Sequence, residues 1–213
     1  MIRFIAAIDD KRGIANDHGI PWQGKIPSDV RYYRDKLRTA TILMGYGLYQ
    51  ELTKPYPGVS NYVATYEQNE VLKSGFEPVY DARRFLLDLP KAPPTPDQLI
   101  SADSGLSSLD VAKATSPSVK PLSARADLPW ERAILRKSSL ENTQGDVWNI
   151  GGAVLFASTF DMADELYLTR LQGDFGCTKF FPEFEDKFER TSSGEPITEN
   201  DITFHFEVWK RKK

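Results

Sequence analysis

The sequence predicts a single α/β domain in which buried strands alternate with helices, plus one long irregular insertion. Three observations support this prediction. Short apolar runs of strand length recur along the chain, and glycine or proline ends most of them. Segments with helical spacing follow several of these runs. The length of 213 residues, 40% of them hydrophobic, suits one domain with a sizeable core.

The expected elements alternate along both halves of the chain. Strands are expected at residues 2–8, 41–44, 61–65, 77–80, 147–150 and 165–171, and a final half-exposed strand runs from Ile202 to Val208. Helices are expected from near Ser28 to Leu37, and at about 48–52, 82–89 and 154–160. Ser28 is the expected N-cap of the first helix, because it follows Pro27 and precedes an apolar stripe. The nearly continuous apolar run at 2–8 is typical of a strand buried in a parallel or mixed sheet.

The composition changes between residue 91 and about residue 144. Pro, Ser, Ala and Asp dominate this stretch, and its apolar residues are sparse and show no clear period. This composition predicts a long loop or a partly disordered insertion. Asp127 to Glu131 is suited to begin a short helix through Leu135, with Pro129 at its first position. Trp130 would either pack the insertion down or anchor a protein partner.

Composition also excludes several classes of protein. The net charge of −3 provides no whole-chain basic field for nucleic acid. The one cysteine excludes an internal disulfide and fits a reducing compartment. We expect a cytoplasmic protein, because no signal peptide and no apolar run of membrane-spanning length is apparent. We expect no metal site, since His18 and His205 lie far apart in the sequence.

The first candidate site lies in the segment from Gly13 to Leu37. A glycine-containing loop leads into a helix in which Asp29 points along the same face as Tyr33. A carboxylate aimed inward beside Trp22 would have a raised pKa and would hold a polar ligand or manage a proton. The alternative is that Asp29 serves only the helix dipole and the free N–H groups of the first turn.

Two glycine junctions form a second candidate site. Gly151 and Gly152 follow the strand at 147–150, and Gly45 to Leu48 follows the strand at 41–44. Residues without side chains let a phosphate approach the backbone at the start of a helix, so two such junctions suit a dinucleotide. The alternative is a pair of tight turns. Neither junction matches a Walker loop or the three-glycine dinucleotide fingerprint.

The order and spacing of several short motifs resemble the dihydrofolate reductase family over about residues 1–90 and 145–213. These motifs are Ile5-Ala6-Ala7, Gly19-Ile20-Pro21-Trp22, Pro27-x-Asp29, Met44-Gly45, Ile150-Gly151-Gly152-Ala153, Glu165 to Thr169, Phe180-Phe181-Pro182 and Phe206-Glu207-Val208. The resemblance implies a central eight-stranded, mostly parallel sheet flanked by helices. It also implies reduction of 7,8-dihydrofolate to tetrahydrofolate with hydride from NADPH, NADH being the alternative donor.

The resemblance also assigns residue roles. Asp29 would hydrogen-bond the pterin and favour protonation at its N5, with Thr169 as a water-linked partner and Trp22 holding an ordered water. The substrate pocket would be walled by Ile5, Ala6, Val30, Tyr33 and Leu52, together with Thr169. The cofactor would contact Ala7, Ile14, Ile20, Gly45, Tyr46, Gly47, Leu48, Thr65, Ile150, Gly151, Gly152, Ala153, Val154, Leu155 and Phe156. Residues 13–20 would form a mobile lid over the nicotinamide.

Three departures from the family pattern keep other functions open. Val59 stands where the family usually has an arginine for the folate carboxylate, which is one of the stronger polar contacts. Tyr46 and Leu48 supply no positive charge for the 2′-phosphate of NADPH. The insertion has no counterpart in the family pattern. The alternatives are a reductase for a related pterin or pyrimidine, and a weakly active scaffold that binds a protein partner through residues 91–144.

Overall fold

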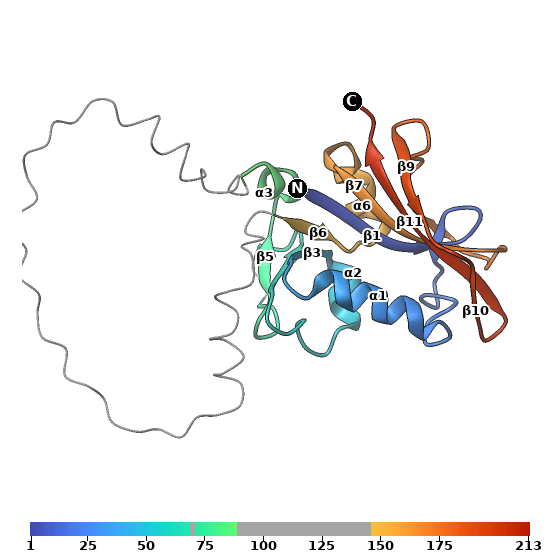
Figure 1. The fold of residues 1–213 in the computed structure, drawn as a ribbon. Coiled ribbons are helices and arrows are strands. Elements are labelled where there is room, and N and C mark those ends of the chain that lie inside the picture. Colours follow the sequence, from blue (N-terminus) through green and yellow to red (C-terminus); the bar gives the residue numbers. More distant parts are fainter. Residues whose placement is uncertain (69–70, 89–145) are drawn as a thin grey trace, which may run out of the picture. The chain divides into compact units, whose positions relative to one another are not determined.

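The protein is described by a computed structural model that covers residues 1–68, 71–88 and 146–213. The expected insertion at 91–144, the short helix at 127–135 and Trp130 lie outside the described residues. Figure 1 shows the described part as one twisted sheet with helices packed against it.

The described residues form one nine-stranded sheet and one two-stranded sheet. The strands of the large sheet are β1 (Ile2–Ile8), β3 (Thr41–Gly45), β4 (Ser60–Ala64), β5 (Glu77–Val79), β6 (Val147–Asn149), β7 (Glu165–Leu171), β9 (Phe188–Ser193), β10 (Ile197–Glu199) and β11 (Ile202–Arg211). Their order is β10-β11-β7-β1-β6-β3-β4-β5, and β9 pairs with β11 off this path. Every pair from β7 to β5 is parallel, and β11 runs antiparallel to β7, β9 and β10. The mostly parallel α/β sheet is therefore confirmed.

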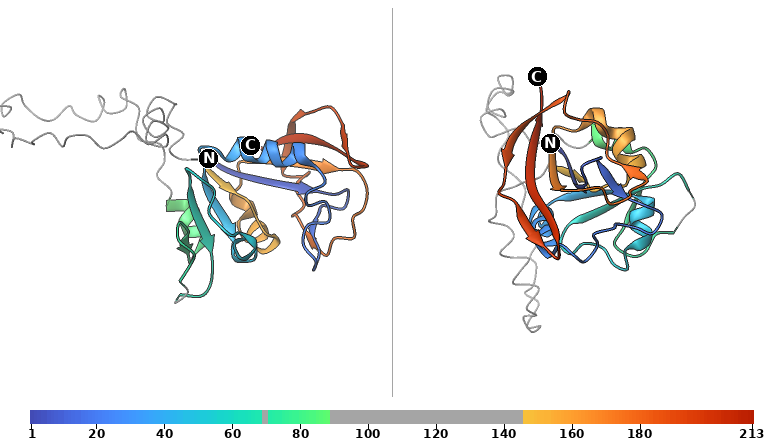
Figure 2. Two further views of the ribbon diagram at one scale, coloured as in Figure 1. Left: turned by 90° about the horizontal axis from the view of Figure 1, so that it is seen from below. Right: turned by 90° about the vertical axis from the view of Figure 1, so that its right-hand side faces the viewer.

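Helices cover both faces of this sheet (Figure 2). They are α1 (Pro27–Leu37), α2 (Tyr46–Glu51), α3 (Ala82–Asp88) and α6 (Ala153–Thr159), the last followed by the 3₁₀ turn η2 (Phe160–Met162). Helices α1 and α2 bury Leu37 and Tyr49 against Ile5 of the central strand β1. Helix α6 packs Phe156 against Phe4, the neighbouring residue of β1, on the other face. Successive side chains of β1 thus serve the two layers in turn, as a central strand requires.

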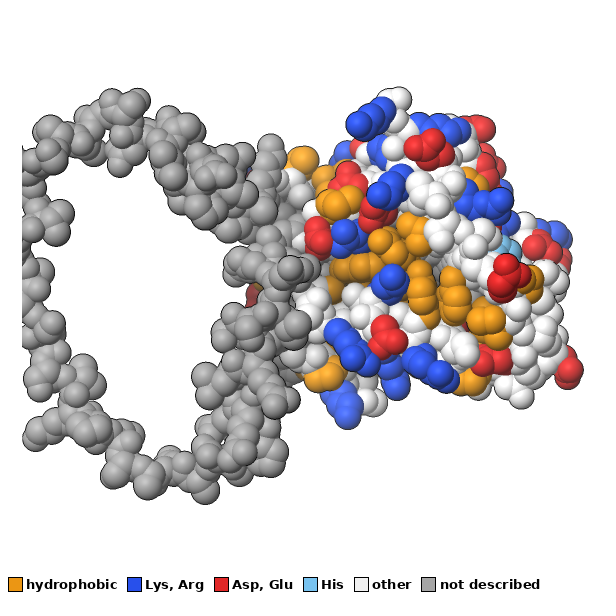
Figure 3. All heavy atoms as spheres, viewed as in Figure 1, with side chains coloured by type: hydrophobic (Ala, Val, Ile, Leu, Met, Phe, Trp, Pro, Cys, Tyr) orange, Lys and Arg blue, Asp and Glu red, His pale blue; other side chains and the backbone are white. Residues whose placement is uncertain are grey.

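An aromatic cluster fixes α1 on the sheet. Tyr32 of α1 stacks on Phe206 of β11 at 4.2 Å between ring centroids. Lys36, one turn later, lies over the ring of Tyr167 in β7 at 5.0 Å. Figure 3 shows a band of apolar side chains on the face of the molecule where α1 meets β11. These contacts orient the helix that holds Asp29.

The predicted bounds differ from the structure in a few places. Residues 2–8 and 165–171 form strands with the predicted bounds, whereas the second helix begins at Tyr46 instead of Leu48. Strands β2 (Gly13–Ala15), β8 (Lys179–Phe180), β9 and β10 were not predicted. Three of these strands have two or three residues, which is too short for a periodic pattern. In β9 only the first residue is buried, so its side chains show no alternation between buried and exposed positions.

Candidate active site

Asp29 lies in the first turn of α1 and turns toward the sheet. Its Oδ1 accepts a hydrogen bond of 2.6 Å from the hydroxyl of Thr169 in β7. Thr169 is 2% exposed and pairs with Ala7 of β1 and Phe206 of β11. The family resemblance implied a contact through water, but the structure joins the two side chains directly. Helix α1 packs closely enough on the sheet for the hydroxyl to reach the carboxylate.

The surroundings of Asp29 favour its protonated form. Burial raises the pKa of Asp29, the hydrogen bond from Thr169 lowers it, and the nearby negative charge of Glu199 raises it, with a net increase. Burial also raises the pKa of Tyr33 well above its ordinary value, so its phenol remains neutral. A carboxyl group that holds its proton to higher pH, near a neutral phenol, is suited to exchange a proton with a bound heterocycle.

The first helix begins differently from the prediction. Its N-cap is Ile26, with no side-chain cap, and Pro27 occupies the first turn. Ser28 is therefore not the N-cap. Its backbone N–H and its hydroxyl both donate to the carboxylate of Glu199 in β10. Glu199, 171 residues away in the sequence, thus accepts a free N–H of the first turn that an N-cap side chain would otherwise accept.

The residues expected to wall the substrate divide into three groups. Ile5, Tyr33 and Leu52 belong to one apolar cluster beside Asp29, on the α1 side of the sheet. Val30 is 38% exposed, so it does not share the buried stripe of Leu37. The side chain of Ala6 points to the opposite face of β1, where it packs against the cluster that contains Phe4. Ala6 therefore presents only its backbone on the Asp29 side.

Trp22 is buried close to the start of α1. It packs with Ile26, Leu171 and Phe204, and its ring meets that of Phe175 edge to face at 5.3 Å. Ala7 packs against the same cluster from β1. Trp22 thus joins the loop before α1 to the sheet.

Tyr33, one helical turn after Asp29, forms a polar contact with the turn after α2. Its hydroxyl lies 3.1 Å from the hydroxyl of Tyr56, which belongs to the turn after α2. That turn is held by the buried amide of Asn61. The amide accepts from the N–H of Tyr56 and donates to the carbonyls of Tyr56 and Val59.

The two glycine junctions meet at the carboxyl ends of the adjacent strands β3 and β6. The N–H of Gly45 donates to the carbonyl of Gly151 at 2.5 Å. A Cβ on Gly45 would lie 3.2 Å from the backbone nitrogen of Gly152. At Gly151 φ is +95°, and a Cβ there would lie 2.6 Å from the ring of Phe156. Gly45 and Gly151 therefore leave little or no room for a side chain, whereas a Cβ on Gly152 would meet nothing within 4 Å.

Two buried polar side chains stabilise this junction from below. The N–H of Gly151 donates to Oδ1 of Asn149, and the Nδ2 of Asn149 donates to the hydroxyl of Thr159. Thr159 in turn donates to the carbonyl of Leu155 in α6. The end of β6 and helix α6 are thus held by one hydrogen-bonded chain.

Comparison with known proteins identifies the family. The family model "Dihydrofolate reductase" matches residues 1–89 and 125–211. The chain belongs to the dihydrofolate reductase family. It is 24% identical over 217 residues to the dihydrofolate reductase of Bacillus subtilis (strain 168), which covers 100% of this chain and 95% of that protein. It is 32% identical over 71 residues to that of Heliothis virescens, covering 30% of this chain and 38% of that protein.

A solved structure supports the same fold. The dihydrofolate reductase from Enterococcus faecalis, complexed with NADP(H) and RAB-propyl, superimposes with a TM-score of 0.65 at 18% sequence identity. The match covers 100% of this chain and 97% of that one. Family and fold together make this protein an enzyme, an oxidoreductase of dihydrofolate reduction.

The remaining residues expected to contact the reductase cofactor lie at several depths. Leu155 and Phe156 are buried and pack α6 on the sheet. Val154 is 71% exposed beside the glycine junction. Of the others, Thr65 is buried directly after β4, Ile14 packs under the loop after β1, and Ile20 is exposed. Tyr46 and Leu48 pack against the α2 side of the core.

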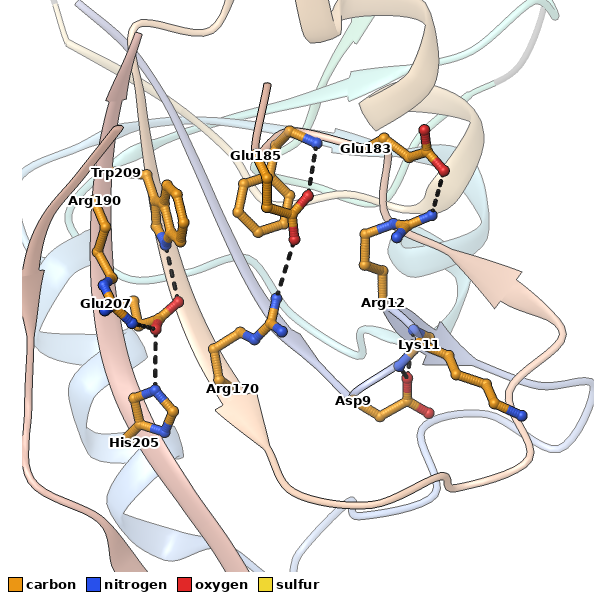
Figure 4. Close-up of polar contacts among 12 residues, drawn as sticks. Asp9, Lys11, Arg12, Arg170, Glu183, Glu185, Arg190, His205, Glu207 and Trp209 are labelled. Carbon is orange, nitrogen blue, oxygen red and sulfur yellow. Dashed lines mark hydrogen bonds and ion pairs between the residues drawn. The ribbon is translucent and has the colours of Figure 1, made fainter. Parts of the chain in front are cut away.

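Two carboxylates organise the loops around the reductase sheet (Figure 4). Asp9, directly after β1, accepts from the N–H groups of Lys11, Gly13 and Phe175. It therefore ties the start of the expected lid to the turn after β7. In β11 the carboxylate of Glu207 accepts hydrogen bonds from Arg190 and Trp209 and lies 3.0 Å from His205. Because Arg190 belongs to β9, this carboxylate links β9 to β11.

Three residues around the reductase site could not be found from the sequence. Tyr56 lies in a proline-rich turn without periodicity, Asn61 reads as an ordinary strand residue, and Glu199 belongs to a three-residue strand. Only the fold brings them to α1.

Among residues 1–68, 71–88 and 146–213, no helix has the length and apolar character needed to cross a membrane. The same residues contain no group of three or more potential metal ligands.

Proposed function

We propose that this protein reduces 7,8-dihydrofolate to tetrahydrofolate, with NADPH as hydride donor and Asp29 as the group that assists protonation of N5. The observation that carries this proposal is the partly buried Asp29, hydrogen-bonded to Thr169 at 2.6 Å and raised in pKa by burial. The apolar cluster of Ile5, Tyr33 and Leu52 beside it offers walls for a flat heterocycle.

Asp29 would hydrogen-bond the pterin and favour protonation of its ring. The reduction adds a hydride to C6 and a proton to N5, so it becomes easier when N5 is protonated. A carboxyl group with a raised pKa retains a proton where an ordinary aspartate has lost it. The hydrogen bond from Thr169 keeps the carboxyl oriented while its charge changes.

The residues at the carboxyl ends of β3 and β6 fit a dinucleotide cofactor. Gly45 and Gly151 leave little or no room for a side chain, whereas a Cβ on Gly152 would meet nothing within 4 Å, so a ligand has room beside the backbone of Gly152. The Enterococcus faecalis relative is named as a complex with NADP(H), which supports the same class of cofactor here. When bound, the nicotinamide supplies the hydride, and the chain supplies orientation and a shielded pocket.

We further propose one reductase domain spanning residues 1–213, interrupted by an insertion at about 91–144 that offers a surface for a protein partner. The single cysteine supports a cytoplasmic location. Val59, which stands where the family usually has an arginine for the folate carboxylate, packs into the apolar cluster with Leu52. This observation favours a related dihydropterin without a charged tail as the second candidate substrate.

A spectrophotometric assay tests these proposals together. Purified protein is mixed with NADPH or NADH, and each is tested alone, with dihydrofolate, and with a dihydropterin that lacks the glutamate. We expect oxidation of NADPH only when a pterin is present. Asp29→Asn is expected to lower the rate by about 10²-fold or more, as for loss of an acid–base group. A well-folded wild-type protein that shows no pterin-dependent oxidation contradicts the proposed function.

A further inference from the structure

The first turn of α1 is held by a carboxylate from the opposite end of the chain. Glu199 Oε2 accepts the N–H of Ser28 at 3.0 Å, and Oε1 accepts the Ser28 hydroxyl at 2.5 Å. Both oxygens of one carboxylate are therefore used on the residue immediately before Asp29. These bonds lower the pKa of Glu199, so it is ionised at neutral pH.

A tight hairpin presents Glu199 to the helix. In the β10–β11 hairpin, Glu199 pairs with Ile202 around the two-residue turn Asn200–Asp201, whose φ angles are +47° and +62°. Positive φ at both positions is the geometry that matches the twist of a two-residue hairpin. The Nδ2 of Asn200 donates to the carbonyl of Lys25 at 2.7 Å. We call Glu199 and Asn200 the hairpin clasp, because they grip the chain on both sides of the Ile26–Pro27 helix start.

The clasp and Thr169 approach Asp29 from two elements. Thr169 in β7 donates to the carboxylate, while Glu199 in β10 places a negative charge nearby. On α1 itself, the phenols of Tyr32 and Tyr33 are neutral because burial raises their pKa values. The cation Arg31 acts on Glu199. Among the groups described around Asp29, Glu199 is thus the like charge that opposes its ionisation.

We propose that Glu199 is a positioning residue for Asp29: it fixes the start of α1 through Ser28 and places its own charge near the Asp29 carboxyl. This inference rests on the proposed role of Asp29 in the reduction. The structure supports it independently through the two-oxygen contact with Ser28. The pKa of Asp29, which the charge of Glu199 raises, points in the same direction.

The test is the substitution Glu199→Gln in the full chain. Glutamine keeps an acceptor for the Ser28 N–H but removes the charge. Glu195→Gln is the matched control, because Glu195 is an exposed carboxylate nearby in the sequence with the same formal charge. Ser28→Ala is the second variant, since it removes the hydroxyl contact and leaves the charge of Glu199 in place.

Two readouts separate this inference from the proposed function. The first is carbon-13 NMR titration of labelled aspartate, with the Asp29 resonance identified by its loss in Asp29→Asn. The second is the pH dependence of kcat/KM for dihydrofolate. We expect Glu199→Gln to lower the Asp29 midpoint by about half a pH unit, since it removes one like charge. The fall of kcat/KM at high pH should move by the same amount.

The expected controls are an unchanged Asp29 midpoint in Glu195→Gln and in Ser28→Ala. Equal midpoints in wild type and Glu199→Gln would overturn the inference, as would equal shifts in Glu199→Gln and Glu195→Gln. A shift in Ser28→Ala as large as that in Glu199→Gln would assign the effect to geometry and overturn the role of charge. Absence of turnover in the wild type would instead contradict the proposed function, and the NMR titration would still decide the role of Glu199.

Discussion

Burial of the Asp29 carboxyl favours the proposed chemistry but lowers the stability of the folded protein. Its pKa in the folded protein lies above the ordinary aspartate value, mainly because of burial. Between these two values the folded chain binds more protons than the unfolded chain, so stability falls as the pH rises through this window. At neutral pH the folded protein therefore holds a carboxylate that the unfolded chain would solvate better.

Asp29→Asn is accordingly expected to raise the melting temperature at neutral pH while it lowers activity. Asparagine keeps an oxygen for the Thr169 hydroxyl but has no charge to bury. In a domain of this size each kcal/mol corresponds to a change of about 2–4 °C. Calorimetry over a pH series measures the effect, which should vanish below the ordinary range of aspartate titration.

The exposed Asp17 provides the control for this prediction. Asp17→Asn removes the same formal charge from the loop before α1 without removing a buried carboxylate. Its melting temperature should follow that of the wild type at every pH. A melting temperature of Asp29→Asn at or below that of the wild type at neutral pH would contradict the interpretation of Asp29 as a destabilising buried acid.

Sequence reasoning located Asp29 but not its surroundings. Helical spacing showed that Asp29 shares a face with Tyr33, because that relation is local. The role of Ser28 was predicted wrongly. A serine before an apolar stripe is usually an N-cap, but here a carboxylate from a distant strand accepts both its N–H and its hydroxyl. Glu199 is that acceptor, and its position depends on pairing between strands far apart in the chain.

At the scale of elements, the strand-to-helix junction after β6 should respond differently to alanine at its two glycines. Gly151→Ala should destabilise the protein by about 2–4 kcal/mol, because φ is +95° and a Cβ would overlap the Phe156 ring. Gly152→Ala is the matched control, since a Cβ there meets nothing within 4 Å and its φ is −85°. Urea unfolding measures both.

The two variants also separate stability from cofactor binding. Gly152→Ala should leave the free energy of unfolding within about 0.5 kcal/mol of wild type. If the exposed backbone at this junction receives the cofactor, Gly152→Ala should still weaken NADPH binding in a fluorescence titration. Equal unfolding free energies for Gly151→Ala and wild type would show that the junction tolerates a side chain.

The turn after α2 depends on one buried amide. Asn61→Ala should cost about 2–4 kcal/mol, because it leaves the Tyr56 N–H and the carbonyls of Tyr56 and Val59 without their partner. The contact between Tyr56 and Tyr33 should loosen, so KM for dihydrofolate should rise. Ser60→Ala, at the exposed neighbouring position, should change neither quantity. A KM unaffected by Asn61→Ala would separate this turn from the substrate site.

Elements with long apolar runs were predicted well, and short or exposed ones were not. Strands β1 and β7 lie in the middle of the sheet, so most of their residues are apolar and their limits are clear. Strand β10 has three residues, and β9 exposes five of its six. Such strands are specified by their partner β11 and not by their own side chains.

For the whole molecule, the insertion provides a test of domain organisation. Every strand of the nine-stranded sheet lies in residues 1–68, 71–88 and 146–213, so deletion of 91–144 with a short flexible linker should leave a folded reductase. The family match resumes at residue 125, so deletion of 91–124 is the matched comparison. Circular dichroism and the reductase assay measure both variants.

The expected result is that both deletions retain reductase activity. If only the shorter deletion is active, residues 125–144 belong to the reductase domain. Pulldown with full-length protein and with each deletion then tests the proposed partner surface. A partner that binds all three proteins equally would contradict a recognition role for the insertion.

The position of β1 in the sheet has a consequence for biosynthesis. Phe4 pairs in parallel register with Asn149 on one side and Leu166 on the other, and both neighbours follow the stretch 89–145. On the ribosome, β1 therefore has no lateral partner until the residues after 145 have been translated. Its apolar surface must be shielded by α1 or by a chaperone during that interval. Slowing translation after residue 90 should accordingly increase aggregation of nascent chains, whereas the same pause after residue 171 should not.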